Sequence, residues 1–180
     1  MDTDGQFRDL ILAAIPSLRA FAISLTNDPS RADDLVQDTI VRAWANADRF
    51  EAGTNINAWL FTILRNLFHS EYRKRRREVE DVDGSYALSL RTQPEQTAHV
   101  DFQDFQQALA KLPVDQREAL ILVGAEGLSY EQAAEICGVA VGTIKSRVNR
   151  ARNRLAEILS LNDDGDIGPD SVIKAAMENV

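Results

Sequence analysis

The chain has 180 residues and a formal net charge of −8, which leaves room for one medium-sized domain or two small ones. Its single cysteine excludes an internal disulfide and a cysteine-rich metal site. Its longest apolar runs are too short to span a bilayer, and its N-terminus lacks the basic and then apolar pattern of a signal peptide. We therefore expect a soluble, cytoplasmic protein.

Apolar residues at helical spacing predict two helices before residue 28. The first covers Phe7 to Ile15. Pro16 should end it, because a proline interrupts the hydrogen bonding of a helix interior but is tolerated in the first turn of the next helix. A turn at residues 27–30 follows, in which Ser30 is a candidate cap for the third helix.

The helix predicted from Arg31 to about Asp48 has two different faces. One face is apolar, includes Trp44, and should lie in the core. The opposite face mixes carboxylates, an amide and small apolar groups, and this composition suits a protein-binding surface. Ordinary solvent exposure explains the same pattern, and periodicity alone favours that simpler interpretation.

Residues 50–56 form a predicted loop, and Asn57 is a candidate cap for the helix after it. Within this helix, Trp59 falls in a strip of hydrogen-bonding side chains. An aromatic ring in such a strip is how proteins hold unstacked bases, but a half-buried structural tryptophan fits equally well. The helix runs into the basic segment 73–77, whose composition suits phosphate binding, although basic runs are often only exposed helix ends.

Helical periodicity is absent from residue 78 to about residue 100, an acidic stretch with Gly84 and Pro94 that we interpret as a linker. Helical spacing returns at Phe102, and Pro113 should begin a further helix. The segment after Leu161 is acidic and has room for a short terminal helix. No strand-like alternation occurs in the sequence, so the predicted fold class is all-α.

Residues 128–155 have the pattern of a helix-turn-helix. Ser129 and Gln132 form a capping-box start for the first helix, and Gly138 ends it. The second helix has an apolar stripe opposite short hydroxyl, amide and guanidinium groups with basic flanks. Such a helix packs by one edge and reads bases in the DNA major groove with the other; the simpler alternative is a solvated cationic helix. The stripe consists of Ile144, Val148, Ala151 and Leu155.

The negative charge of the chain is unevenly distributed. Residues 65–77 and 142–156 each carry a net charge of +5, whereas the segments around them are acidic. Overall repulsion from DNA opposes counterion release at such basic patches. We therefore expect the chain to bind free DNA poorly and to meet DNA when a larger partner presents it.

Little in the sequence supports an enzyme. His69 and His99 have no metal-ligand spacing to each other or to Cys137, and no glycine-rich phosphate loop occurs in the sequence. Cys137 is best explained as a small apolar residue at the corner of the helix-turn-helix. We therefore expect no catalysis, no metal and no cofactor.

The chain carries, in this order, the motifs DDLVQDTIVRAW, NAWLFTILRNLFHSEYRKRRR, LPVDQREALILV and the final helix-turn-helix. This order of motifs resembles that of bacterial RNA polymerase sigma factors, specifically the compact extracytoplasmic-function group that keeps only regions 2 and 4. Similarity to the general-stress-response branch of alphaproteobacteria is carried by TILRNLFHSEYRKRRREVED, REALILVGAEGLSYEQAAEICG and VGTIKSRVNRAR. The resemblance covers about residues 8–160.

The resemblance implies two small helical domains joined by an acidic flexible linker. Region 2 would cover residues 1–78, the linker 79–100, region 4 101–160 and an acidic tail 161–180. It also implies three partners and no membrane: core RNA polymerase, bound at the β′ coiled coil and the β flap; promoter DNA; and a NepR-like anti-sigma protein that holds the factor inactive. Unstacking a base costs a few kcal/mol, so the polymerase would have to help in opening the promoter.

The resemblance further assigns functional residues on these two domains. Core polymerase would be bound by Asp33, Asp34, Gln37, Asp38 and Arg42. The −10 element would be bound by Asn55, Ile56, Trp59, Arg65, Asn66, Ser70, Arg73, Lys74, Arg75, Arg76 and Arg77. The −35 element would be bound by Thr143, Lys145, Ser146, Arg147, Asn149, Arg150 and Arg154, with Arg147 and Arg154 on phosphates.

Two other functions stay open at this point. A sigma-like decoy would bind the anti-sigma protein without touching DNA, but it need not keep cations on its recognition helix and would normally be attached to a receiver domain. A stand-alone helix-turn-helix regulator would sense a ligand with its N-terminal half. A polar strip running into five cations is a poor basis for a small-molecule pocket.

Overall fold

The computed structural model describes residues 3–80 and 102–159, and every element in these two ranges is helical, which confirms the all-α fold class. The elements are α1 (Thr3–Thr26), α2 (Pro29–Ala45), the 3-10 turn η1 (Ala47–Arg49), α3 (Ile56–Glu80), α4 (Phe102–Ala110), α5 (Val114–Leu120), the π-helical turn η2 (Ile121–Ala125), α6 (Tyr130–Cys137) and α7 (Val141–Ile158). The predicted linker beyond residue 80, the acidic tail and its terminal helix lie outside the described residues.

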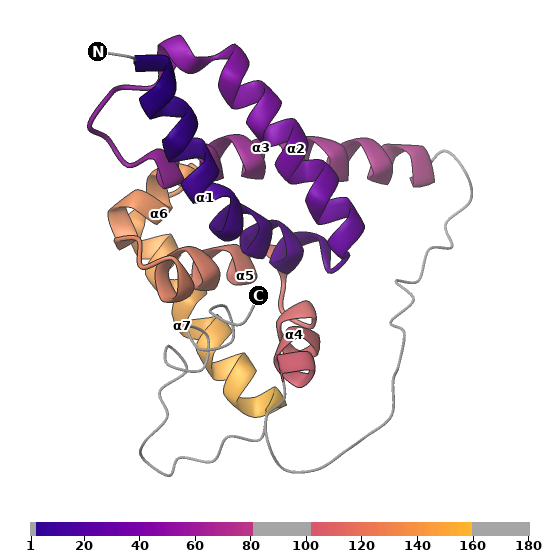
Figure 1. Cartoon of the computed structure of the whole chain (residues 1–180). Coiled ribbons are helices and arrows are strands. Elements are labelled where there is room, and N and C mark those ends of the chain that lie inside the picture. Colours follow the sequence, from indigo (N-terminus) through magenta and orange to yellow (C-terminus); the bar gives the residue numbers. More distant parts are fainter. Residues whose placement is uncertain (1–2, 81–101, 160–180) are drawn as a thin grey trace.

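Helices α1, α2 and α3 form the N-terminal bundle (Figure 1). Apolar side chains from all three helices meet in its core, where the rings of Phe21 and Phe61 lie 5.1 Å apart in an edge-to-face arrangement. Trp44, which the sequence places on the core face of α2, is instead 50% exposed. Its ring packs on Phe7 at 5.8 Å.

Helix α1 is continuous through Pro16, so the predicted break there is wrong. The apolar stripe continues in phase on both sides of the proline, with Ile11 and Ala14 before it and Leu18 and Phe21 after it, all buried. Packing of this stripe against α2 and α3 outweighs the loss of one backbone hydrogen bond at an exposed position.

Residues Gly5–Thr26 of α1 are also long and apolar enough to cross a membrane by length and composition, with a mean hydropathy of 1.5. This corrects the expectation that every apolar run is too short. The core helix of a bundle passes the same test, and the buried stripe of α1 lies against α2 and α3. The helix is therefore explained by its place in the bundle.

The connection between α1 and α2 is a tight turn in which Asn27 adopts a left-handed backbone conformation, with φ of 52°. The Asp28 carboxylate accepts hydrogen bonds from the backbone N–H groups of Ser30 (2.9 Å) and Arg31 (3.2 Å). Asp28 is therefore the cap of α2, and the predicted cap Ser30 is wrong by two residues. Pro29 fits the first turn, where its missing N–H costs nothing.

Helices α4 to α7 form the C-terminal half. The predicted capping box between Ser129 and Gln132 is present, and Gly138 ends α6 with φ of 65°. The predicted apolar stripe of α7 is buried along its whole length. Cys137 is buried, and desolvation raises the pKa of its thiol to about 11, which agrees with a packing residue.

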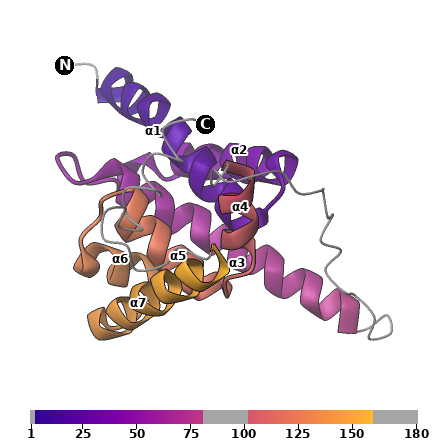
Figure 2. The same ribbon diagram turned by 90° about the horizontal axis from the view of Figure 1, so that it is seen from below.

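The two halves pack against each other, a feature that the sequence analysis did not predict. Helix α3 lies against α6, and α1 lies against α4 and α5 (Figures 1 and 2). The buried apolar side chains of both halves belong to one cluster. The described ranges thus adopt a closed arrangement of two bundles.

Candidate nucleic-acid interface

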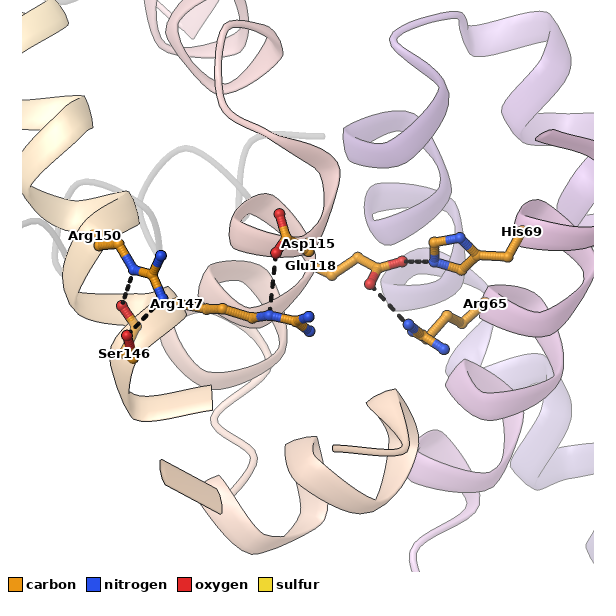
Figure 3. Close-up of polar contacts among 7 residues, drawn as sticks. All are labelled: Arg65, His69, Asp115, Glu118, Ser146, Arg147 and Arg150. Atoms are coloured by element: carbon orange, nitrogen blue, oxygen red, sulfur yellow. Dashed lines mark hydrogen bonds and ion pairs between the residues drawn. The ribbon is translucent and has the colours of Figure 1, made fainter. Parts of the chain in front are cut away.

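Helix α7 presents its polar face to solvent. Lys145, Ser146, Asn149 and Arg150 are all exposed, opposite the buried stripe. The Arg150 guanidinium donates to Ser146 Oγ at 2.7 Å, one turn back along the helix (Figure 3). This contact holds the forked donor group of Arg150 close to the helix surface. The face that the sequence analysis expects to read bases is therefore open to solvent.

Lys145 is held at the junction of the two helices of the helix-turn-helix. Its Nζ lies 5.7 Å from the centroid of the Tyr130 ring in α6, within range of a cation–π interaction. The ring therefore fixes the direction in which this lysine leaves the helix. Thr143, in the first turn of α7, is half-buried.

The two arginines expected to anchor phosphates lie in different surroundings. Arg147 Nε pairs with Asp115 Oδ2 of α5 at 3.2 Å, and only 18% of the Arg147 side chain is exposed. Arg147, which is expected to bind a phosphate, is therefore engaged within the chain in this structure, and its pair with Asp115 joins α7 to α5 (Figure 3). Arg154 is 61% exposed and lies 3.7 Å from Glu157, so it is accessible to a phosphate.

Trp59 belongs to a cluster of aromatic rings at the start of α1 and α3. Its ring lies 5.4 Å from Phe50 and 6.1 Å from Phe7, and Phe7 in turn contacts Trp44. We name Phe7, Trp44, Phe50 and Trp59 the aromatic cluster. Of the two interpretations of Trp59, this packing favours the structural one, since the ring is half-buried among other side chains.

The loop between α2 and α3 projects from this cluster. Residues 51–55 are exposed, and Gly53 has φ of 90°, a conformation that favours glycine. The Asn55 side chain accepts hydrogen bonds from the backbone N–H groups of Asn57 (3.0 Å) and Ala58 (3.3 Å). Asn55 therefore caps α3, and the predicted cap Asn57 is wrong by two residues.

The polar strip of α3 divides into two parts. Asn66 and Ser70 are exposed, as are the five basic residues 73–77 that follow. Arg65 instead turns towards α5, where its Nε lies 3.1 Å from Glu118 Oε2. His69 Nε2 lies 2.5 Å from the other carboxylate oxygen of Glu118 (Figure 3). Arg65 is thus engaged within the chain rather than facing solvent.

Glu118 is the residue that sequence analysis missed. It and Arg117 are two charged residues in the run REALILV, and both are buried. Charged residues at buried positions of a helix need partners, so their place in an apolar run was the available signal. Nothing in the sequence pattern indicates that the partners of Glu118 are Arg65 and His69, which lie 53 and 49 residues away in the other half.

The acidic face of α2 faces the basic end of α3 across a shallow cleft of about 470 Å³. Its lining consists of Arg31, Asp34, Gln37, Asp38, Glu71, Lys74 and Arg75. Asp33 lies outside the cleft and pairs with Arg19 at 2.7 Å, and Arg42 is exposed on α2. The cleft thus brings together residues expected to bind polymerase and residues expected to bind DNA.

Known proteins share both the sequence and the arrangement of these helices. Residues 10–78 match the family model of sigma-70 region 2, and residues 102–155 match that of sigma-70 region 4. The chain is 64% identical over 177 residues to the extracytoplasmic-function RNA polymerase sigma factor EcfG of Rhodopseudomonas palustris (strain TIE-1), covering 98% of each chain. The chain belongs to the extracytoplasmic-function sigma factors.

Solved structures agree with this family. The sigma factor RpoE of Bartonella quintana, in complex with the anti-sigma factor NepR, superposes with a TM-score of 0.78 at 57% identity over 87% of this sigma factor and 98% of that chain. The anti-anti-sigma factor PhyR of the same organism, also complexed with NepR, gives a TM-score of 0.55 at 19% identity over 83% of this chain and 49% of that one. The likeness to PhyR shows a shared fold and no more.

Proposed function

We propose that this sigma factor binds core RNA polymerase, recognises the −35 and −10 elements of promoters and helps to open the DNA, so that general stress response genes are transcribed. It would act in the cytoplasm as a regulator without catalytic activity of its own. The observation that carries the proposal is the exposed polar face of α7, backed by a buried stripe, in a chain closely related to EcfG.

At the −35 element, α7 would enter the major groove with its exposed face. Asn149 and Arg150 have the amide and guanidinium groups that pair with base edges, while Lys145 and Ser146 add shorter-range contacts. Thr143 and Arg154, near the two ends of the helix, suit phosphates. Arg147 would act indirectly, since its pair with Asp115 supports the angle at which α7 leaves the bundle.

At the −10 element, the exposed loop before α3 would receive a base flipped from the non-template strand. Its accessible tip, with Asn55 and Ile56 at its end, supports this role. Asn66 and Ser70 would hold the strand along α3, and the basic run at residues 73–77 would bind duplex phosphates. Trp59 would support the base of the loop through the aromatic cluster.

Core polymerase would dock on the outer face of α2. Asp34, Gln37 and Asp38 are exposed and line the cleft, and Arg42 extends the same helix face. These charged and amide groups suit the β′ coiled coil, while region 4 would contact the β flap. Asp33 would contribute only after leaving its pair with Arg19.

A NepR-like anti-sigma protein is the proposed regulator, because the related RpoE was solved in complex with NepR. The alternative is a decoy that binds such a protein and never touches DNA. The cations kept on the exposed face of α7 and in residues 73–77 favour the sigma factor.

The proposal is tested by run-off transcription from a general stress promoter with purified chain and core polymerase. We expect promoter-specific transcripts with the chain and none without it, whereas the chain alone should barely shift the same duplex in a gel. Absence of specific transcripts, together with tight binding of a NepR-like protein, would establish the decoy instead.

A further inference from the structure

Glu118 carries a fully buried carboxylate at the contact between the two halves. Its side chain is 0% exposed, and its two oxygens face Arg65 and His69, both from α3 of the other half. The Arg65 and His69 side chains are 17% and 29% exposed. We name these three residues the Glu118 contact (Figure 3).

One further polar contact joins the halves beside it. The buried Arg117 donates from Nη1 to the carbonyl oxygen of Ser24 in α1 at 2.8 Å, and from Nη2 to the carbonyl oxygen of Leu112 in its own half at 2.9 Å. Polar groups of the C-terminal half therefore reach both α1 and α3.

The Glu118 contact depends on closure of the two halves. A carboxylate without water is stabilised only when hydrogen-bonding partners replace the water, and here the Arg65 guanidinium and the His69 ring both come from α3. If the halves separate, these partners are lost and water must solvate Glu118, Arg65 and His69. The contact therefore favours the closed arrangement and withdraws Arg65 from the polar strip of α3.

We propose that the Glu118 contact is autoinhibitory: the Glu118 carboxylate occupies the Arg65 guanidinium where a DNA phosphate would otherwise bind, so the −10 strand is held only after the two halves separate. The inference rests on the proposed function and on the resemblance to sigma factors, which assigns Arg65 to the −10 strand. A carboxylate and a phosphate are both anions that accept from a guanidinium, so they exclude each other at this one group.

The affinity for the −10 strand depends on the fraction of molecules in which the two halves are separated. When only a fraction of the molecules is open, the apparent dissociation constant for the strand equals the intrinsic constant divided by that fraction. A substitution that removes the charge of Glu118 raises the open fraction and tightens strand binding, although no residue that touches DNA has changed. A substitution of Arg65 also opens the chain but removes the strand contact.

The test uses the full chain with fluorescent labels at Asp48→Cys and Lys111→Cys, both exposed and one in each half, in a Cys137→Ala background. Energy transfer between the labels reports closure. We expect Glu118→Gln to shift the ratio of open to closed molecules by at least about tenfold, because it removes one partner of a buried ion pair. The matched control is Asp115→Asn, a carboxylate of the same helix that pairs within its own half, and it should leave closure unchanged.

Binding of a fluorescent single-stranded oligonucleotide of random sequence, measured at low salt, completes the test. Glu118→Gln should bind it more tightly than the parent, whereas Arg65→Gln should open the chain without this gain. If Glu118→Gln does not fold by circular dichroism, Arg65→Gln and His69→Gln test the contact from α3, and energy transfer equal to the parent in both would overturn the proposal.

The proposal is also overturned if Glu118→Gln is as closed as the parent, or if Arg65→Gln gains the same affinity for the oligonucleotide. Failure of the proposed function has a different signature. In that case the parent chain supports no run-off transcription with core polymerase, while energy transfer still reports whether Glu118 closes the halves.

Discussion

Replacement of Arg150 by alanine should weaken recognition of the −35 element without lowering the stability of the fold. The side chain is exposed, and its hydrogen bonds in the described ranges go to Ser146, at 2.7 Å from Oγ and 3.4 Å from the carbonyl oxygen. Loss of such a surface contact should change the free energy of unfolding by less than about 0.5 kcal/mol. Loss of a bidentate base contact should cost about 1–3 kcal/mol, which is about 5- to 150-fold in the binding constant.

The assay is run-off transcription by holoenzyme on a set of promoters that differ at single −35 positions, with thermal denaturation of each variant as a stability check. Arg150→Ala should lose its preference at one −35 position and keep its melting temperature. Arg154→Ala is the matched control, because this exposed arginine suits a phosphate. It should weaken binding of the holoenzyme about equally on all promoters. The slope of the logarithm of the binding constant against the logarithm of the salt concentration should become smaller in magnitude by about 1.

Two results would refute this reasoning. If Arg150→Ala shows the same preferences as the parent among promoters that differ at single −35 positions, Arg150 does not read a base. A melting temperature lowered as strongly as the loss of transcription would show that the side chain supports the fold instead.

Three further predictions concern neighbouring features. Trp59→Ala should lower the free energy of unfolding by about 2–3 kcal/mol, because it removes a half-buried ring from the aromatic cluster; loss of promoter opening at unchanged stability would contradict this. Asp115→Asn should cost at most about 1 kcal/mol by thermal denaturation, because the carboxylate that pairs with Arg147 is 49% exposed. Burial raises the pKa of Glu126 to about 7, so its ionisation opposes folding: stability should fall as pH rises from about 4.5 to about 7 and then level off, and Glu126→Gln should flatten this part of a pH series of melting curves.

The elements that the sequence predicted well are those set by local periodicity. The apolar stripe of α7 and the capping box at Ser129 depend on residues three or four apart on one helix, and both are present. The exposed face of Asn149 and Arg150 follows from the same periodicity, because a helix that buries one edge must expose the other.

The errors occur where two local choices differ little in energy or where tertiary packing decides. Asp28 and Ser30 are both good caps, as are Asn55 and Asn57, and only the path of the chain selects between them. Pro16 is tolerated inside α1 because buried residues on both sides keep the helix in phase. Helical spacing puts Arg65 on the polar strip of α3, but it carries no information about the pairing of Arg65 with Glu118 in the other half.

The cleft between α2 and α3 has a consequence for inhibition. Asp34 and Asp38 on one wall are proposed for polymerase, whereas Lys74 and Arg75 on the other are proposed for promoter phosphates. A single molecule bound in this cleft would cover both walls. One small inhibitor could therefore separate the factor from the enzyme and from its template in the same event, without approaching the recognition helix.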